Sequence, residues 1–433
     1  MALTISLAII GILGMLICIF KFPSFKVGAH SFDTFYLPIL FIALILLIFP
    51  IFDKKELFEI LFSNSKLNPL KILILFISVS FISIVLDEGG FFSFVAIKFI
   101  NKFKKSQYAL FFSLYLLISI LTIFTSNDIV ILTFTPFILY FAKRGNINPI
   151  PFLVMEFVAA NTYSMLLPIG NPTNVYLSSI YKLDFISYIL KMLIPTIFIG
   201  ITSIVVLLVI FKKDLNKKIE VFDDKAVFLK NKTICIVSLI HLALTTILLV
   251  ISNYINIEMW IIAAIFGLSL FIFMIGYSII KKNHLYISQP FVRLPFSLIP
   301  FILSMFVIIQ ALESYDVFIY VSDLFNKINN DNIKEIVYLL SSTISCNLVN
   351  NIPMTIAFGS ILQNSDNINL VYATIMGSNI GAILSPVGAL AGIMWLRILK
   401  QNDVEYGFLK FLKNGSIITL FLIIAGSIAL LII

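Results

Sequence analysis

Long apolar runs separated by short polar segments extend along the whole chain. An apolar run of about 18 residues is long enough to cross a lipid bilayer as a helix. We therefore expect ten transmembrane helices, at Leu3–Phe20, Thr34–Ile51, Pro69–Leu86, Pro151–Pro168, Met192–Phe211, Thr233–Ser252, Met259–Ile280, Pro295–Leu312, Ile368–Leu384 and Phe411–Ile432.

Two further apolar regions, 107–142 and 336–362, are interrupted in the middle by polar residues. The first interruption reads Thr125-Ser126-Asn127-Asp128, and the second runs from Ser345 to Asn351. Each region is either a pair of full crossings or a re-entrant hairpin with a polar tip. Backbone that leaves the helix at membrane depth must be buried in protein or line a cavity.

The distribution of basic residues favours re-entrant hairpins. With the N-terminus outside and both regions re-entrant, 22 of the 30 Lys and Arg residues fall on one side of the membrane. The positive-inside rule makes that side cytoplasmic. We therefore predict that both termini lie outside and that the polar segment 212–232 is a cytoplasmic linker. The amphipathic segment Phe91–Lys105 should lie on the cytoplasmic surface, and Val317–Lys327 on the outer surface.

An internal repeat relates the two halves of the chain. Asn127-Asp128-Ile129 recurs 223 positions later as Asn350-Asn351-Ile352, and Asn161, Pro168 and Gly170 recur 218 positions later as Asn379, Pro386 and Gly388. Because each half has an odd number of crossings, the halves should be inverted in the membrane. The predicted division is residues 1–211 (hairpin 107–142, broken helix 151–182), linker 212–232, and residues 233–433 (hairpin 336–362, broken helix 368–399).

Composition agrees with an all-α polytopic membrane protein. Hydrophobic residues make up 60% of the 433 residues and charged residues 12%, about half the share of a soluble domain. The net charge of +8 arises from short clusters between apolar runs, which speaks against a nucleic-acid partner. The three Cys and three His residues are scattered, so we expect no metal site. An enzyme is not expected either, since the chain has neither His-Glu-x-x-His nor Gly-x-Ser-x-Gly. A passive channel remains a further, weaker alternative.

Four polar clusters are candidates for a substrate site. Two are the hairpin tips, and two are Pro- and Gly-containing interruptions that should break a helix. A broken helix exposes free N–H groups at one end and free carbonyls at the other. Taken singly, each cluster is also typical of structural packing, but four related by a repeat favour one site near the midplane. The predicted substrate-binding residues are Ser126, Asn127, Asp128, Gly170, Asn171, Thr173, Asn174, Asn350, Asn351, Ser378, Asn379, Ser385 and Gly388.

Two acids are candidates for coupling to a proton or another cation. Asp128 lies at the first hairpin tip and Glu156 lies within a predicted crossing. An ionisable side chain inside a membrane is costly and usually functional. The alternatives are that Asp128 only caps the helix that follows it and that Glu156 pairs with a lysine. Cys346 is either an apolar filler or a ligand for a thiophilic substrate.

These residues resemble the ion transporter superfamily, within it the branch of arsenite/antimonite permeases (arsenical pump membrane proteins) and sodium/proton antiporters. The resemblance covers nearly the whole chain. Divalent anion/sodium symporters share the architecture, but their tips usually read Ser-Asn-Thr, and Ser378-Asn379 stands where arsenite permeases can carry Cys-Asp. The motifs that carry the resemblance are LDEGGFF (86–92), TSNDIVILTFTP (125–136), NLVNNIPMT (347–355) and MGSNIGAILSPVGALAGIMW (376–395).

The resemblance implies a secondary transporter of the cell membrane with an elevator-type movement of the hairpin-bearing part. We expect arsenite or antimonite export in exchange for protons. The alternative is a sodium/proton antiporter or a sodium-coupled carrier of carboxylates or inorganic anions. No cofactor is expected besides the coupling ion, H⁺ or Na⁺. The expected partners are a small anion or oxyacid and the lipid bilayer. A homodimer and a cytoplasmic ATPase subunit stay open.

Overall fold

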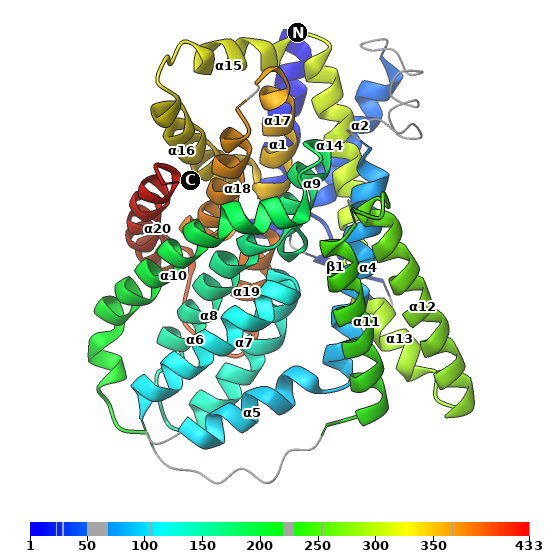
Figure 1. The fold of residues 1–433 in the computed structure, drawn as a ribbon, viewed down its shortest axis with the longest axis vertical. Coiled ribbons are helices and arrows are strands. Elements are labelled where there is room, and N and C mark those ends of the chain that lie inside the picture. Colours follow the sequence, from blue (N-terminus) through cyan, green and yellow to red (C-terminus); the bar gives the residue numbers. More distant parts are fainter. Residues whose placement is uncertain are drawn as a thin grey trace.

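The computed structural model describes residues 1–22, 24–27, 30–49, 68–103, 106–219, 229–252, 254–365 and 367–432. Helices dominate these residues, which confirms an all-α polytopic membrane protein (Figure 1). The first part of the chain contains α1 (Ala2–Lys21), α2 (Tyr36–Ile48), α4 (Pro69–Glu88), α5 (Phe91–Phe103), α6 (Gln107–Phe124), α7 (Asn127–Arg144), α8 (Ile150–Tyr163), α9 (Pro172–Ile180) and α10 (Phe185–Leu215). The later part contains α11 (Lys232–Val250), α12 (Met259–Ile280), α13 (Leu285–Val292), α14 (Leu298–Glu313), α15 (Val317–Asn326), α16 (Asp331–Val349), α17 (Asn351–Ile361), α18 (Asn369–Leu384), α19 (Leu390–Gln401) and α20 (Phe408–Leu430).

A short β-hairpin joins α1 to α2, which the sequence analysis did not predict. Its strands β1 (Ser24–Val27) and β2 (His30–Asp33) are antiparallel, and Ser24 lies opposite Asp33. Part of the predicted linker, residues 220–228, lies outside the described residues, as do residues 50 and 51 of the second predicted crossing and residues 104 and 105 of the predicted surface helix.

Seven helices in the described ranges are long and apolar enough to span a membrane: α1, α4, α6, α10, α11, α12 and α20. Six of them fall on predicted crossings, and α6 is the first arm of a predicted hairpin. The other four predicted crossings correspond to the shorter helices α2, α8, α14 and α18. Two of these end at the predicted breaks, and α14 bends by 73° into α15. A multi-pass protein is thus confirmed, whereas the number of ten crossings stays a prediction.

Both interrupted regions fold as hairpins that enter and leave at one end. At the first, Gln107 Nε2 donates to Lys217 O at 3.0 Å, and Asn148, just after α7, hydrogen-bonds to Asp214. Both arms therefore meet the C-terminal end of α10. At the second, Glu335 Oε1 near the start of α16 accepts from Asn369 Nδ2, beyond α17, at 3.1 Å. The polar tips turn the chain back inside the molecule, and the re-entrant character of the two hairpins in a membrane stays a prediction.

The two broken helices are interrupted where Pro and Gly predicted. α8 gives way to the 3₁₀ turns η1 (Ser164–Leu166) and η2 (Pro168–Gly170) before α9, and η4 (Pro386–Gly388) separates α18 from α19. Asn171 caps α9 by accepting from Thr173 N at 3.2 Å, and Pro172 occupies the first helical position. Asn at the N-cap and Pro at the next position are both favourable, so the local sequence restarts the helix there.

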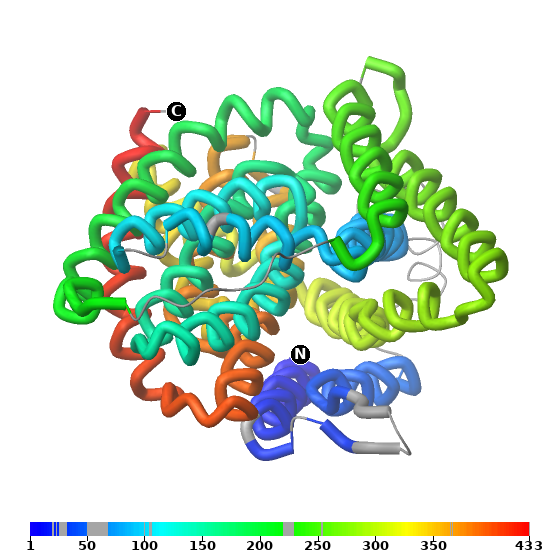
Figure 2. The backbone as a smooth tube through the Cα atoms, turned by 90° about the horizontal axis from the view of Figure 1, so that it is seen from below, coloured from blue at the N-terminus to red at the C-terminus, as the bar shows by residue number. Residues whose placement is uncertain are grey.

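The helices pack as two bodies that do not coincide with the two halves of the sequence. In the hairpin body, which comprises α6–α10 and α16–α20, α16 packs on α18 and α10 packs on α20. In the flanking body, which comprises α1, α2, α4, α11, α12 and α14, α14 packs on α2 and α12 packs on α4 (Figure 2). The bodies meet where α4 contacts α7 and α9 and where α14 contacts α17.

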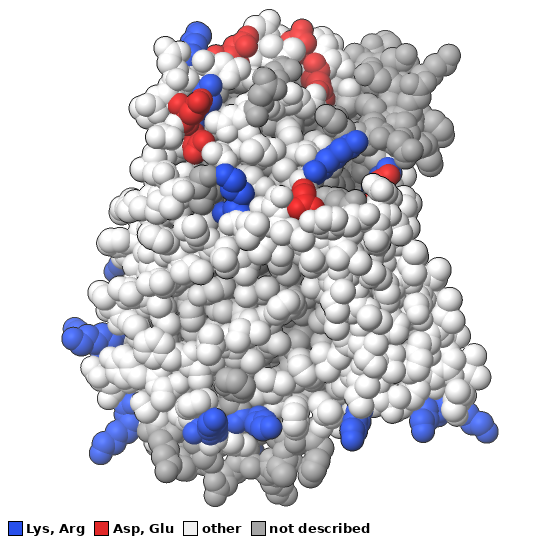
Figure 3. Space-filling model, viewed as in Figure 1, with Lys and Arg blue, Asp and Glu red and all other residues white. Residues whose placement is uncertain are grey.

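The two surface helices lie at opposite ends of the molecule, with α5 at one end and α15 at the other (Figure 1). On the face drawn in Figure 3, the charged side chains along the α5 end are Lys and Arg, whereas the Asp and Glu side chains lie in the half toward the α15 end, together with further Lys and Arg. This arrangement agrees with inverted repeats and with a cytoplasmic α5 end, although the orientation in the membrane stays a prediction.

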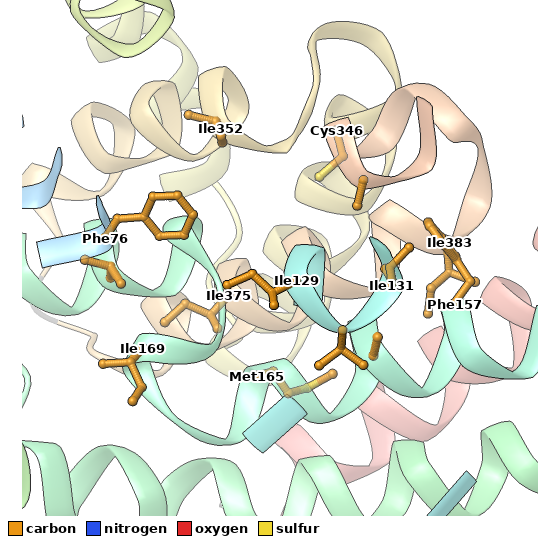
Figure 4. Packing of buried hydrophobic residues seen from close by; sticks show 14 of the residues in the cluster. Phe76, Ile129, Ile131, Phe157, Met165, Ile169, Cys346, Ile352, Ile375 and Ile383 are labelled. Carbon is orange, nitrogen blue, oxygen red and sulfur yellow. The ribbon is translucent and has the colours of Figure 1, made fainter. Parts of the chain in front are cut away.

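The hairpin body encloses much of the apolar core. Figure 4 shows Ile129 and Ile131 of α7, Met165 of η1, and Ile375 and Ile383 of α18, all buried in one apolar cluster. Because both halves of the sequence contribute to this cluster, the two breaks and the two hairpin tips are held by a shared core.

Gly170→Ala should destabilise the protein, because a Cβ at this position would lie 2.2 Å from the backbone oxygen of Ser164. Overpacking of this kind costs about 1–3 kcal/mol. Gly276→Ala is the matched control, since a Cβ there meets nothing within 4 Å. Thermal midpoints in detergent would be compared. Equal midpoints for both variants would contradict the close packing of the first break.

Candidate functional site

A buried amide network joins the first helix break to α18. We use this name for Asn127, Asn161, Ser164, Asn171, Asn174 and Asn379, which are all fully or almost fully buried. They come from α7, α8, η1, α9 and its cap, and α18. None carries a formal charge, so the network presents only amide and hydroxyl groups.

Asn379 is the centre of this network. Its Oδ1 accepts from Ser164 Oγ at 2.9 Å and from Asn171 Nδ2 at 3.0 Å. Its Nδ2 donates to Asn174 Oδ1 at 2.9 Å and to the carbonyl of Ile375 at 2.8 Å. One side chain from the second half of the sequence therefore fixes the first break. Thr173, another predicted site residue, reaches the edge of the network through Asn174 Oδ1, 3.4 Å from its Oγ1.

The tip of the first hairpin joins the network through Asn127. Its Nδ2 donates to Asn161 Oδ1 at 3.1 Å, and Asn161 Nδ2 donates to the carbonyl of Phe157. Asn127 Oδ1 and Ser126 Oγ are buried, and neither has a hydrogen-bond partner in the part of the chain that the structure describes. Buried polar atoms are usually paired, so such atoms at a hairpin tip are candidates to contact a ligand.

The tip of the second hairpin forms a separate set of hydrogen bonds around η4. Asn350, whose φ is +78°, donates from Nδ2 to the carbonyl of Val387 at 3.0 Å. Ser385 Oγ donates to Asn347 Oδ1 at 2.6 Å, and Asn347 Nδ2 donates to the carbonyl of Gly381 on α18. α18 thus contacts both clusters. Asn351 is buried at the start of α17, and Ser378 Oγ is buried on α18 without a partner among the described residues.

Two of the predicted binding residues have packing roles. A Cβ at Gly170 or at Gly388 would lie 2.2 Å or 2.5 Å from a backbone oxygen, that of Ser164 or Gly381. Both glycines therefore allow close approach of two backbone segments at a break. This close packing accounts for both glycines without a ligand.

Asp128 lies outside both clusters. It is in the first turn of α7, but Ser126 is the N-cap, and the Asp128 carboxylate has no hydrogen bond or ion pair within the described residues. The alternative that Asp128 serves as a helix cap is therefore wrong. Its side chain instead lines a cavity of about 720 Å³ between the hairpin body and the flanking body, together with Ser126.

Glu156 is fully buried on α8, and both of its carboxylate oxygens lie 3.1 Å from Thr135 Oγ1 on α7. No lysine pairs with it in the described ranges, contrary to the alternative raised from the sequence. Cys346 is buried, and its Sγ lies 3.6 Å from the carbonyl of Ser378. This agrees with a small side chain that fills space beside α18.

Sequence reasoning missed four residues that the structure places at these sites. The sequence could have identified two of them. Asn161 is the repeat counterpart of Asn379, and Asn347 lies within the polar stretch of the second hairpin tip. Arg293 and Arg397, which line the cavity with Asp128, are two of the 22 basic residues that the sequence analysis counted only for the positive-inside rule. Arg293 is neutralised at the end of α4, where it donates to Asp87 and to Glu88, both at 2.7 Å.

The known proteins to which this chain is similar are membrane transporters. A family model described as citrate transporter matches residues 3–369. The arsenical pump membrane protein of Escherichia coli is 24% identical over 369 residues, which cover 80% of this chain and 82% of that protein. A putative arsenical pump membrane protein of Bacillus subtilis is 25% identical over 365 residues (78% and 81%). An uncharacterized transporter of Methanocaldococcus jannaschii is 27% identical over 395 residues (89% and 94%).

Among solved structures, the YdaH transporter of Alcanivorax borkumensis has the same fold. Its TM-score is 0.58 at 10% sequence identity, and the match covers 99% of this chain and 97% of that chain. The crystal structure of that transporter is described as having an unusual topology. The match covers nearly the whole of both chains, so the similarity in fold extends over both bodies.

Proposed function

The chain belongs to the citrate transporter family and is a membrane transporter, and on this premise we propose that it exports arsenite or antimonite in exchange for protons. The two bodies and the cavity between them support an elevator-type alternating access, in which the hairpin body moves relative to the flanking body. Arsenical pump membrane proteins among the relatives support the substrate class.

The observation that carries this proposal is the uncharged character of the amide network. At neutral pH arsenite is an uncharged trihydroxide, whose three O–H groups both donate and accept hydrogen bonds. Asn and Ser side chains offer both kinds of group without a charge. Asn127 Oδ1 and Ser126 Oγ supply acceptors at the hairpin tip that no described residue uses. Asp128 beside them would carry the proton.

Acridine-orange dequenching in everted vesicles with an acid interior tests the proposal. We expect addition of arsenite or antimonite to dissipate the pH gradient and restore fluorescence, whereas vesicles without the protein stay quenched. Dequenching by Na⁺ or Li⁺ alone, with no response to metalloids, would reject metalloid export and identify a cation/proton antiporter.

The second candidate is a sodium-coupled carrier of carboxylates or inorganic anions, which the family description favours. Uptake of labelled citrate or succinate that requires Na⁺, together with no metalloid response, would establish it. A homodimer and a cytoplasmic ATPase subunit stay open.

A further inference from the structure

The cavity between the two bodies has the size and the lining of a site for an organic molecule. Its volume of about 720 Å³ lies within the range of about 300–1,000 Å³ that is usual for small-molecule pockets. Such pockets are mostly apolar, with a few polar groups that fix the ligand. The apolar lining includes Ile19 of α1, Phe76 and Ile84 of α4, Phe291 of α13, Leu294, and Ile393 of α19.

Four charged side chains line this cavity: Asp33, Asp128, Arg293 and Arg397. Arg293 is already neutralised by the two acids at the end of α4. Asp33 Oδ2 accepts from Ser297 Oγ at 3.0 Å. Arg397 differs from Arg293, because its only hydrogen bond among the described residues runs from Nη2 to Ser24 Oγ, at 3.0 Å, and it has no ion pair there.

The half-buried guanidinium of Arg397 has no ion pair among the described residues, so most of its hydrogen-bond donors lack a partner there. Removing a cation from water costs free energy unless an anion or hydrogen-bond acceptors replace the water. The guanidinium has five N–H groups in a planar fork that fits a carboxylate through two parallel hydrogen bonds. Arg397 uses one of these five with Ser24, so most of its donors remain for a ligand.

The charged side chains of the lining favour a ligand that carries a single negative charge. Arg397 is the single cation of the described lining without an acid partner, and Asp33 and Asp128 repel every carboxylate that does not contact Arg397 directly. A citrate or succinate ion would place its remaining charge against these acids or the apolar walls. A molecule with one carboxylate and an apolar body can pair with Arg397 through the carboxylate and pack its body against the apolar lining.

We propose that this cavity binds an organic monocarboxylate with an apolar body, whose carboxylate is held by Arg397. The proposal goes beyond metalloid export and does not depend on it. Since Ser126 and Asp128 line the same cavity, a ligand bound there lies directly in front of the first hairpin tip.

Binding of labelled 4-phenylbutyrate to the full-length protein in lipid nanodiscs tests the proposal, with empty nanodiscs as the blank for partition into lipid. We expect saturable binding, competed by the unlabelled acid at least tenfold better than by the uncharged 4-phenylbutyramide or by citrate. Equal competition by the amide would overturn the role of a cation. Absence of saturable binding above the blank would overturn the site.

Variants of the lining residues test whether the ligand binds in this cavity. Arg397→Gln should weaken binding at least tenfold, and Arg397→Lys should weaken it less. Lys400→Gln is the matched control, because Lys400 is exposed on the same helix and does not line the cavity. Ile393→Trp should abolish binding by filling the cavity while it leaves Arg397 in place.

Gel-filtration profiles and thermal midpoints identify any variant that does not fold. If the Arg397→Gln protein does not fold, the affinity of the Ile393→Trp protein alone tests whether the ligand binds in the cavity. A folded Arg397→Gln or Ile393→Trp protein with unchanged affinity would overturn the proposal.

Discussion

Replacing Asp128 by asparagine should lower proton-coupled metalloid efflux by about a hundredfold or more, because the group that carries the proton is lost. Asparagine has nearly the same shape as aspartate but cannot take up and release a proton. The Asp128 side chain makes no hydrogen bond or ion pair within the described residues, so the substitution breaks no contact there. We therefore expect the variant to fold with an unchanged thermal midpoint. Arsenite-induced dequenching in everted vesicles measures the loss.

Asp323→Asn serves as the control for this experiment, since Asp323 is exposed on α15 at the far end of the molecule. It should transport like the unmodified protein. Full dequenching by the Asp128→Asn variant would show that Asp128 does not couple transport to protons. Glu156→Gln would then be the next variant, because Glu156 is the second acid named from the sequence and is fully buried in the hairpin body.

The hairpins and helix breaks could be predicted because a membrane leaves few places for polar residues. A short polar stretch in the middle of an apolar run, such as Ser126-Asn127-Asp128, must turn back inside protein or line a cavity. Pro and Gly at 168–172 and at 386–388 cannot continue an unstrained helix. These local rules hold whatever surrounds the segment, so both hairpins and both breaks appear where the sequence placed them.

The lengths of several membrane helices could not be predicted, because composition alone does not decide where a helix begins and ends within an apolar run. The run 295–312 predicts one straight span, but α14 begins at Leu298 and bends by 73° into α15. The β-hairpin at 24–33 was missed since its strands are only four residues long and join two spans. Tertiary contacts hold it, with Ser24 bonded to Arg397 and Asp33 bonded to Ser297.

The candidate site was predicted as a set of residues but not as a geometry. The repeat paired Asn161 with Asn379, but it could not show that Asn379 would hydrogen-bond to Asn171 and Asn174 across the two halves. Asp128, expected inside the same site, faces a cavity instead. Arg397 was missed because a basic residue near a span end is typical of the positive-inside pattern. A linear pattern does not reveal which side of α19 meets the cavity.

Asn379→Leu should both destabilise the protein and abolish transport. Leucine has a similar volume but can neither donate nor accept, so Asn171 Nδ2 and Asn174 Oδ1 lose a buried partner and Ser164 Oγ loses one of two. An unsatisfied buried polar group costs about 1–3 kcal/mol, and several together should lower the thermal midpoint by roughly 5 °C or more. The break that positions Asn171 would relax, and efflux should fall with it.

Asn379→Asp separates the two halves of this argument. An unpaired buried charge is costly, so the new side chain is expected to be the neutral acid, which still accepts from Ser164 and Asn171. Its O–H group replaces one of the two donor contacts that Asn379 makes to Asn174 Oδ1 and to the carbonyl of Ile375, so we expect a smaller drop in the midpoint than for leucine. Asn402→Leu is the control, because Asn402 is exposed at the end of α19 and, within the described residues, its side chain hydrogen-bonds only to Ile398 O. An Asn379→Leu protein with an unchanged midpoint and normal efflux would show that the amide network neither holds the break nor contributes to the substrate site.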